Sequence, residues 1–312
     1  MRRILRSWCL GLGLGLTLGA HAQDQPPSAT PFTEEVLVEA AEPRYAAPTL
    51  RDRIGRIWAP VLINGKGPFR LVLDTGATTS AIIDSVARRL ELKTEASQMV
   101  ALNGATGSMQ APYVKVDSLQ VGDLALTGTN LPILPAVFGG AEGVLGTSGL
   151  SDKRILIDFR RDLIDIRYSR SQPPPVGFIT IPFTIVRGRL VSFDIQIGGI
   201  RTHAILDTGA QLSVGNNSLR EALERRGKPA KDVEIIGVTL AVEHGESLPT
   251  PAINLGGASL QNLRITFGDM FIFEQWGLTH QPTLLLGMDV IGVMETVIID
   301  YKRKQLYFRV RA

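Results

Sequence analysis

Two copies of one pattern follow each other along the chain, and this internal repeat restricts the fold more than any other feature. The first copy contains APVLINGKGPFRLVLDTGATTSAI and the second contains VSFDIQIGGIRTHAILDTGAQLSV. Each has a strand-like run, a glycine-containing turn and a second strand that ends in Asp-Thr-Gly-Ala. Further on, each has an apolar-apolar-Gly element, Val144-Leu145-Gly146 or Leu285-Leu286-Gly287, and a closing hairpin over 154–166 or 296–308. The repeat predicts two similar units rather than two unrelated domains.

The elements within each copy are short and mostly strand-like. Turn residues recur at short spacing, as in the two-residue hairpin turn Gly198-Gly199, which is typical of mainly β proteins. One short helix is expected after each Asp-Thr-Gly-Ala, beginning near Asp84 and near Asn217. The stretch 267–282 of the second copy has no counterpart in the first. Its Phe271, Phe273 and Trp276 are expected in the core rather than in a specificity pocket.

The first residues are organised as a secretory signal peptide. Arg2, Arg3 and Arg6 precede an apolar stretch over 8–19, and Ala20-His21-Ala22 supplies the small residues of a cleavage site. The apolar stretch is too short for a comfortable permanent membrane span, although a short anchor is the alternative. We therefore expect removal of 1–22 and an exported protein. A periplasmic location is favoured, with full secretion as the alternative.

Composition divides the remaining chain. Residues 23–50 are rich in Pro, Ala and polar groups and are expected to be a flexible lead-in. Three consecutive prolines mark 169–178 as a linker, because they continue neither a helix nor a strand ladder. The two units are then 51–168 and 179–312.

Charge and cysteine content exclude several classes of function. The chain has 33 Lys and Arg against 30 Asp and Glu, so removing the three arginines of 1–22 leaves it formally neutral. A neutral chain has no basic field for nucleic acid. The one cysteine lies in the removed segment, and none of the four histidines pairs with another at metal-ligand spacing. Neither a metal nor a cofactor is expected.

The paired Asp-Thr-Gly-Ala turns carry the candidate chemistry. A single copy, around Asp74 or Asp207, is most simply read as an ordinary turn. Two copies at matching places of a repeat, each after an apolar strand, argue against two ordinary turns and favour a functional motif. Asp158 and Asp300 also recur in matching places, but no Gly follows them and their hairpin setting favours structural roles.

These motifs resemble those of the aspartic proteases. LVLDTGATTS with GVLGT, and AILDTGAQLS with LLLGMD, look most like the retropepsin-like DTGA branch of bacterial proteins, fused in tandem as in bilobal pepsin-like enzymes. The resemblance covers roughly 54–310. It implies a duplicated acid-protease β-barrel whose two lobes are related by a pseudo-two-fold axis.

The resemblance also implies roles for individual residues. Asp74 and Asp207 would share a proton and activate one water between them, because two close carboxylates do not both ionise cheaply. The site would be braced by the residues that follow each Asp, namely Thr75, Gly76, Ala77, Thr208, Gly209 and Ala210. The two alanines stand where pepsin-like enzymes carry Ser or Thr. Without that hydroxyl the pKa of the aspartate pair should be higher, which predicts an activity optimum in mild acid.

The implied substrate is an extended peptide or protein segment that binds as an added β-strand. A flap would cover it, with Gly104, Ala105, Thr106 and Gly107 at the tip. A second flap would lie near 236–248, where the match is poorer, so the sequence leaves open whether one flap or two operate.

The leading hypothesis is thus an exported aspartic endopeptidase. A non-catalytic peptide-binding protein on the same bilobal fold is the alternative, and a self-assembling structural protein is a third. Intact motifs in both copies favour the enzyme. Because one chain supplies both halves of the site, a monomer is expected.

Overall fold

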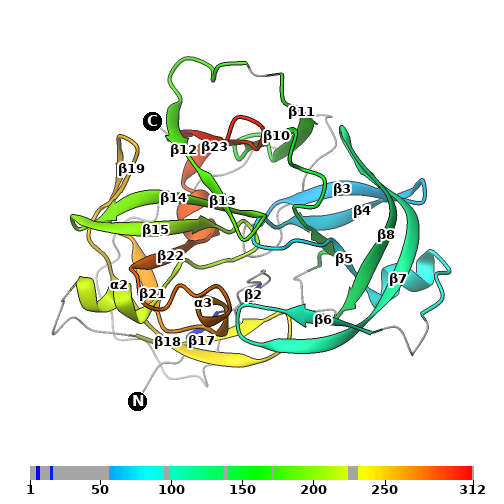
Figure 1. The fold of residues 1–312 in the computed structure, drawn as a ribbon, viewed down its shortest axis with the longest axis horizontal. Coiled ribbons are helices and arrows are strands. Elements are labelled where there is room, and N and C mark those ends of the chain that lie inside the picture. Colours follow the sequence, from blue (N-terminus) through cyan, green and yellow to red (C-terminus); the bar gives the residue numbers. More distant parts are fainter. Residues whose placement is uncertain are drawn as a thin grey trace, which may run out of the picture.

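The computed structural model describes residues 5–7, 15–16, 56–94, 99–135, 140–170, 172–223 and 231–310. In this part the chain is mainly β, as the sequence predicts, and its strands form two large sheets and one smaller sheet between them (Figure 1). The expected lead-in, 23–50, and most of 1–22 lie outside the described residues. Among the residues described, no helix is long and apolar enough to cross a membrane.

The first half of the chain forms a closed barrel with one added strand. Strands follow the order β3-β4-β9-β5-β8-β7-β6, and β3 also pairs with β7, which closes the barrel. The bounds are β3 Trp58–Ile63, β4 Lys66–Leu73, β5 Ala81–Ile83, α1 Asp84–Arg89, β6 Met99–Asn103, β7 Ser108–Val121, β8 Leu124–Leu134 and β9 Gly143–Leu145.

The second half repeats this strand order in a larger sheet. Its order is β17-β18-β21-β16-β22-β15-β14-β19-β20, with β13 paired to β14, while β1 and β2 pair with β17. The bounds are β1 Leu5–Ser7, β2 Gly15–Leu16, β13 Thr184–Val186, β14 Leu190–Ile197, β15 Ile200–Leu206, β16 Val214–Gly215, α2 Asn217–Ala222, β17 Lys231–Gly237, β18 Val242–Pro249, β19 Ile253–Leu255, β20 Ala258–Leu260, β21 Arg264–Phe267, α3 Phe271–Gln275, β22 Thr283–Leu286 and α4 Met288–Ile291.

The closing hairpins of the two halves join each other in the third sheet. Its order is β11-β10-β23-β24-β12, and β10 of the first half runs antiparallel to β23 of the second. The bounds are β10 Lys153–Asp158, β11 Leu163–Tyr168, β12 Ile179–Pro182, β23 Met294–Asp300 and β24 Gln305–Val310. This sheet ties the halves together through main-chain hydrogen bonds, which the sequence did not reveal.

Hydrophobic periodicity accounts for the strands that carry the site. In β14, Phe193, Ile195 and Ile197 are buried while Asp194 and Gln196 point outward, the alternation of a half-buried strand. The turn into β15 is Gly198-Gly199, both with positive φ, as expected for a two-residue hairpin. The following strand, β15, ends at the second Asp-Thr-Gly-Ala.

The same strand pairing precedes both motifs. In the first half β4 runs parallel to β9, and β5 runs antiparallel to β9 on its other side. In the second half β15 runs parallel to β22, and β16 runs antiparallel to β22. The apolar-apolar-Gly elements form β9 and β22, so each lies beside the strand that ends at its Asp. This explains why they recur.

Candidate active site

Asp74 and Asp207 meet at the centre of the molecule. A Cβ placed at Gly76 would lie 2.9 Å from Oδ2 of Asp207, so the first motif's backbone lies directly against the second motif's carboxyl group. Both aspartates have 0% of their surface exposed. The structure therefore brings together two acids from distant parts of the chain in one buried site.

Each aspartate is held by its own turn in the same way. Oδ1 of Asp74 accepts hydrogen bonds from the N–H groups of Gly76 and Ala77, at 2.9 and 3.0 Å. Oδ1 of Asp207 accepts from Gly209 and Ala210 at the same two distances. In the part of the chain described, neither Oδ2 has a hydrogen-bond partner, although both are buried. One oxygen of each acid is thus fixed, and the other is available for chemistry.

The two threonines of the motifs brace the opposite halves. Oγ1 of Thr75 donates to the carbonyl of Leu206 at 2.7 Å and accepts from the N–H of Thr208 at 3.1 Å. Thr208 mirrors this, because its Oγ1 donates to the carbonyl of Leu73 at 2.6 Å and accepts from the N–H of Thr75 at 3.1 Å. These four buried hydrogen bonds hold the carboxyl groups together against their repulsion.

Burial raises the free energy cost of ionising this pair. It raises the pKa of Asp207 to about 7, and the pKa of Asp74 lies well above its usual value because of burial and the charge of Asp207. The turn N–H groups oppose this rise in both acids by stabilising the charged form. The pair therefore retains a proton well above the pH at which an exposed aspartate loses it.

Two further residues influence the pair and were missed by the sequence reasoning. Arg56 is fully buried, and its positive charge lowers the pKa of both Asp74 and Asp207. Tyr301, in the turn between β23 and β24, is buried, and its pKa is raised by burial and by the charge of Asp74. A signal for Arg56 does exist in the sequence, since Gly55-Arg56 and Gly188-Arg189 precede their aspartates by equal distances.

A serine also recurs at the end of each motif and was likewise missed. Oγ of Ser80 accepts from the N–H of Gly146 at 3.1 Å, and Oγ of Ser213 accepts from the N–H of Gly287 at 3.0 Å. A Cβ at either glycine would come within 2.7 Å of backbone in the loop after its Asp-Thr-Gly-Ala. Each serine–glycine hydrogen bond therefore holds the loop after the motif against the end of the neighbouring strand, β9 or β22.

Two hairpin tips cross at the site, one from each half. The β6–β7 tip includes Gly104, Ala105, Thr106 and Gly107, and the β17–β18 tip spans 237–241. Oγ1 of Thr106 donates to the carbonyl of Ala241 at 2.7 Å and accepts from the N–H of Gly237 at 3.0 Å. The sequence match for a second flap near 236–248 was poor, which left open whether one flap or two operate. The two hairpins lie at matching positions, so both are candidate flaps.

Each tip is anchored in the opposite half. Ala105 belongs to the same buried cluster as Ala210 of the second motif, and its carbonyl accepts from the N–H of Ile272 in α3. Val238 of the other tip belongs to the same buried cluster as Ala77 of the first motif. Figure 1 shows the β6–β7 hairpin extending toward α3. The crossed tips contribute to the cover over the buried acids.

The two aspartates set aside as structural lie at their hairpins, as the sequence predicts. Oδ1 of Asp158 accepts from the N–H groups of Arg160 and Arg161 in its hairpin turn, and Oδ1 of Asp300 accepts from Arg303 and from Oγ of Ser169. Phe273 of α3 and Trp276 at its end are buried in the core, whereas Phe271, also expected there, is only partly buried at the start of the helix. The described residues contain no cluster of three or more His, Cys, Asp or Glu that could hold a metal.

Comparison with known proteins identifies the family. The family model described as Aspartyl protease matches residues 59–148 and 193–290, one match in each half. None of the curated proteins matches the chain. Both matches contain an Asp-Thr-Gly-Ala motif, and together they cover more than half of the chain, so this protein belongs to the aspartyl protease family.

Proposed function

We propose that the protein is an aspartic endopeptidase that hydrolyses peptide bonds with Asp74 and Asp207. The observation that carries the proposal is the pair of buried Oδ2 atoms, one from each half, beside two Oδ1 atoms that are already held by turn N–H groups. One water bound between the two Oδ2 atoms would meet both a general base and a general acid.

The chemistry follows from a proton shared by the pair. The ionised aspartate takes a proton from the water, which attacks the peptide carbonyl carbon. The protonated aspartate donates to the carbonyl oxygen as the tetrahedral intermediate forms. The roles then reverse, so that the departing amine receives a proton. Because burial raises both pKa values and Ala77 and Ala210 supply no hydroxyl, we expect the activity to peak in mild acid.

The substrate would be an extended peptide lying between the crossed hairpin tips and the acids. With both aspartates fully buried, the tips must separate before a peptide can enter. The bonds of Thr106 to Ala241 and Gly237 would then break, and main-chain groups of the hairpins would become free to pair with the peptide. We further propose that the mature protein is exported to the periplasm and acts as a monomer, since one chain contains both acids.

Cleavage of a mixed peptide library, read by mass spectrometry, tests the proposal. Asp74→Asn and Asp207→Asn should each lower the rate by about 10³-fold or more, because each removes a proton-transfer group. Asp158→Asn is the matched control. Its Oδ1 can still accept the turn N–H groups, so its rate should equal that of the wild type. Wild-type protein that binds peptides without cutting them would instead support the binding-protein alternative.

A further inference from the structure

A cavity beside the first motif includes one residue from the second half. Its volume is about 430 Å³, within the range of pockets that hold small ligands. Ala77 and Thr78 form the wall next to Asp74, whose Oδ1 accepts the N–H of Ala77, and Tyr113 of β7 forms another wall. Arg189, which precedes β14, closes the cavity from the second half.

Among the described residues that line the cavity, Arg189 is the only charged one. Its Nε is buried and has no hydrogen-bond partner, and no carboxylate pairs with it within the described ranges of the chain. The side chain as a whole is only partly buried, but its Nε is a buried donor without an acceptor, which costs free energy that an anionic ligand would recover. The other polar side chains of the lining, such as those of Thr78, Asn103 and Asn130, are neutral. They can hydrogen bond to a peptide but cannot form an ion pair with Arg189.

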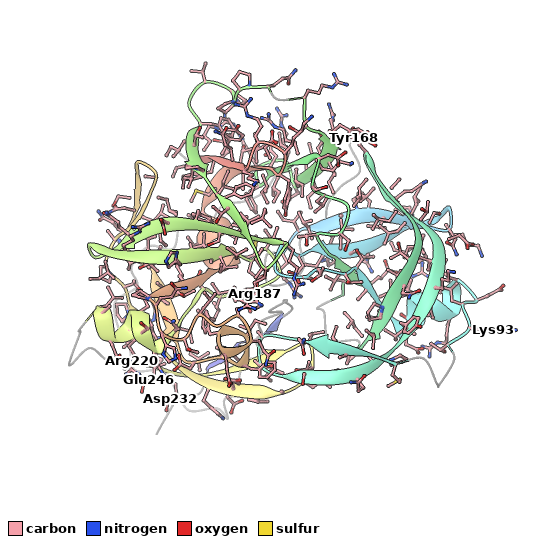
Figure 2. The ribbon with its side chains drawn as sticks, in the orientation of Figure 1. Lys93, Tyr168, Arg187, Arg220, Asp232 and Glu246 are labelled. Atoms are coloured by element: carbon pink, nitrogen blue, oxygen red, sulfur yellow. The ribbon has the colours of Figure 1, made fainter. Side chains whose placement is uncertain are left out.

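The backbone holds Arg189 in place through a tight turn. Arg187 and Gly188 both have positive φ, at 51° and 74°, and the N–H of Arg189 donates to the carbonyl of Val186 at 3.1 Å. The guanidinium group of Arg187 donates from Nε and Nη2 to the carbonyl of Trp276, at 3.1 and 2.6 Å. Arg187 thus fastens the turn to the end of α3. Figure 2 shows Arg187 at the middle of the molecule, close to α3.

Two positive charges therefore stand side by side at this edge of the site. Burial and the charge of Arg187 both lower the pKa of Arg189. Arg187 is bound by the neutral carbonyl of Trp276, and none of the acids that the structure describes pairs with it. Both guanidinium groups favour a negative group nearby, and the planar fork of Arg189 matches a carboxylate.

We propose that Arg189 selects peptide substrates that place a carboxylate in this cavity, close to the bond that is cut. The inference rests on the proposed endopeptidase activity and names the substrate class of the same site. The carboxylate belongs either to a Glu or Asp side chain or to the C-terminus of a short peptide. In an extended peptide alternate side chains point to the same side, so one acidic residue near the scissile bond can reach the cavity while its neighbours do not.

Matched peptides test this selection. A peptide found to be cut is synthesised with Glu or Gln at each position in turn, and with a free or amidated C-terminus. The wild-type enzyme should show kcat/KM about 10-fold or more higher for Glu than for Gln at one position, as expected for one charge-assisted pair. Arg189→Met should abolish that preference, and Arg189→Glu should favour a Lys at the same position. An effect of the C-terminal amide alone would assign the carboxylate to the chain end.

The controls separate this inference from the proposed function. Arg160→Met makes the same change of charge in the remote β10–β11 turn and should keep the full preference for Glu. Cleavage without any preference for a carboxylate, or a preference unchanged in Arg189→Met, would overturn the inference while leaving the protease intact.

If no peptide is cut, the library peptide that binds most tightly is synthesised with Glu or Gln at each position, and its binding is measured by fluorescence anisotropy. Binding is measured with wild type and with Arg189→Met. Tighter binding of the Glu peptide that is lost in Arg189→Met would then support the inference without catalysis. Equal binding of both peptides would refute it.

Discussion

Thr75 and Thr208 each hydrogen bond to the backbone of the other's half. The hydroxyl of Thr75 donates to the strand that leads to Asp207, and the hydroxyl of Thr208 donates to the strand that leads to Asp74. Each hydroxyl also accepts the other threonine's N–H. Because these bonds are buried and cross between the halves, they set the distance between the two carboxyl groups.

Removing one of these hydroxyls should weaken both the fold and the site. Thr75→Val keeps the shape of the side chain but leaves the N–H of Thr208 and the carbonyl of Leu206 without partners. Each unsatisfied buried group costs about 1–3 kcal/mol, so for these two groups we expect a loss of about 2–6 kcal/mol in the free energy of unfolding. Denaturant unfolding followed by fluorescence measures it. Thr75→Ser retains the hydroxyl and should lose about 1 kcal/mol or less; equal losses in both variants would contradict the bracing role.

The crossed hairpin tips should open more readily without the Thr106 hydroxyl. Thr106→Val removes both hydrogen bonds to the β17–β18 tip while keeping the volume of the side chain. We expect the amide of Gly237 to exchange with solvent at least about 10-fold faster, corresponding to about 1.4 kcal/mol of lost stabilisation. Hydrogen exchange followed by mass spectrometry measures this. Thr106→Ser is the control, and equal protection of Gly237 in all three proteins would show that the hydroxyl does not hold the tips.

The charge of Arg56 should control the pH range in which the pair works. Arg56 lowers the pKa of both aspartates, so replacing it with a neutral residue of similar length raises both. In Arg56→Met the whole profile of kcat/KM against pH should therefore shift to higher pH. Arg56→Lys keeps the charge and should stay near the wild-type profile. If Met and Lys give the same profile, packing rather than charge explains the contribution of Arg56.

Most of the fold could be predicted from local patterns in the sequence. The strands before Asp74 and Asp207, the Gly198-Gly199 turn and the helices at Asp84 and Asn217 all follow from periodicity and turn chemistry within a few residues. The meeting of the two aspartates was implied by the resemblance of the motifs to those of aspartic proteases, and no local pattern encodes it.

Contacts between distant segments were harder to infer. The pairing of β10 with β23 depends on how the halves dock, and no local pattern encodes it. The same holds for Ala105, a small residue in a glycine-rich tip that inserts into the core of the other half. Arg56 and Arg189 occupy similar places in the repeat, yet one influences the dyad and the other lines the cavity. Such differences between the copies appear only in three dimensions.

The stability of the protein should depend on pH through the buried pair. The pKa of Asp207 is about 7 in the folded protein and ordinarily 3.8, so the folded state binds its proton more tightly than the unfolded chain does. The stabilisation that results is complete below pH ~4 and is lost as the pH rises through about 7. Asp207→Asn removes the ionisable group while its Oδ1 can still accept from Gly209 and Ala210.

We therefore expect Asp207→Asn to be more stable than the wild type at pH 7, by about 1–4 kcal/mol, since each unit of pKa corresponds to about 1.4 kcal/mol. Near pH 4 the two proteins should unfold at similar denaturant concentrations. Asp158 lies in a hairpin turn away from the pair. The variant Asp158→Asn should therefore not become more stable relative to the wild type between pH 4 and pH 7. Because Asp289, with its pKa raised to about 6 by burial, is present in all three proteins, its contribution cancels in the comparison. An equal gain in the free energy of unfolding at pH 4 and pH 7 would show that ionisation of the pair does not cause the difference. Only a group that loses its proton between these pH values can make the gain depend on pH.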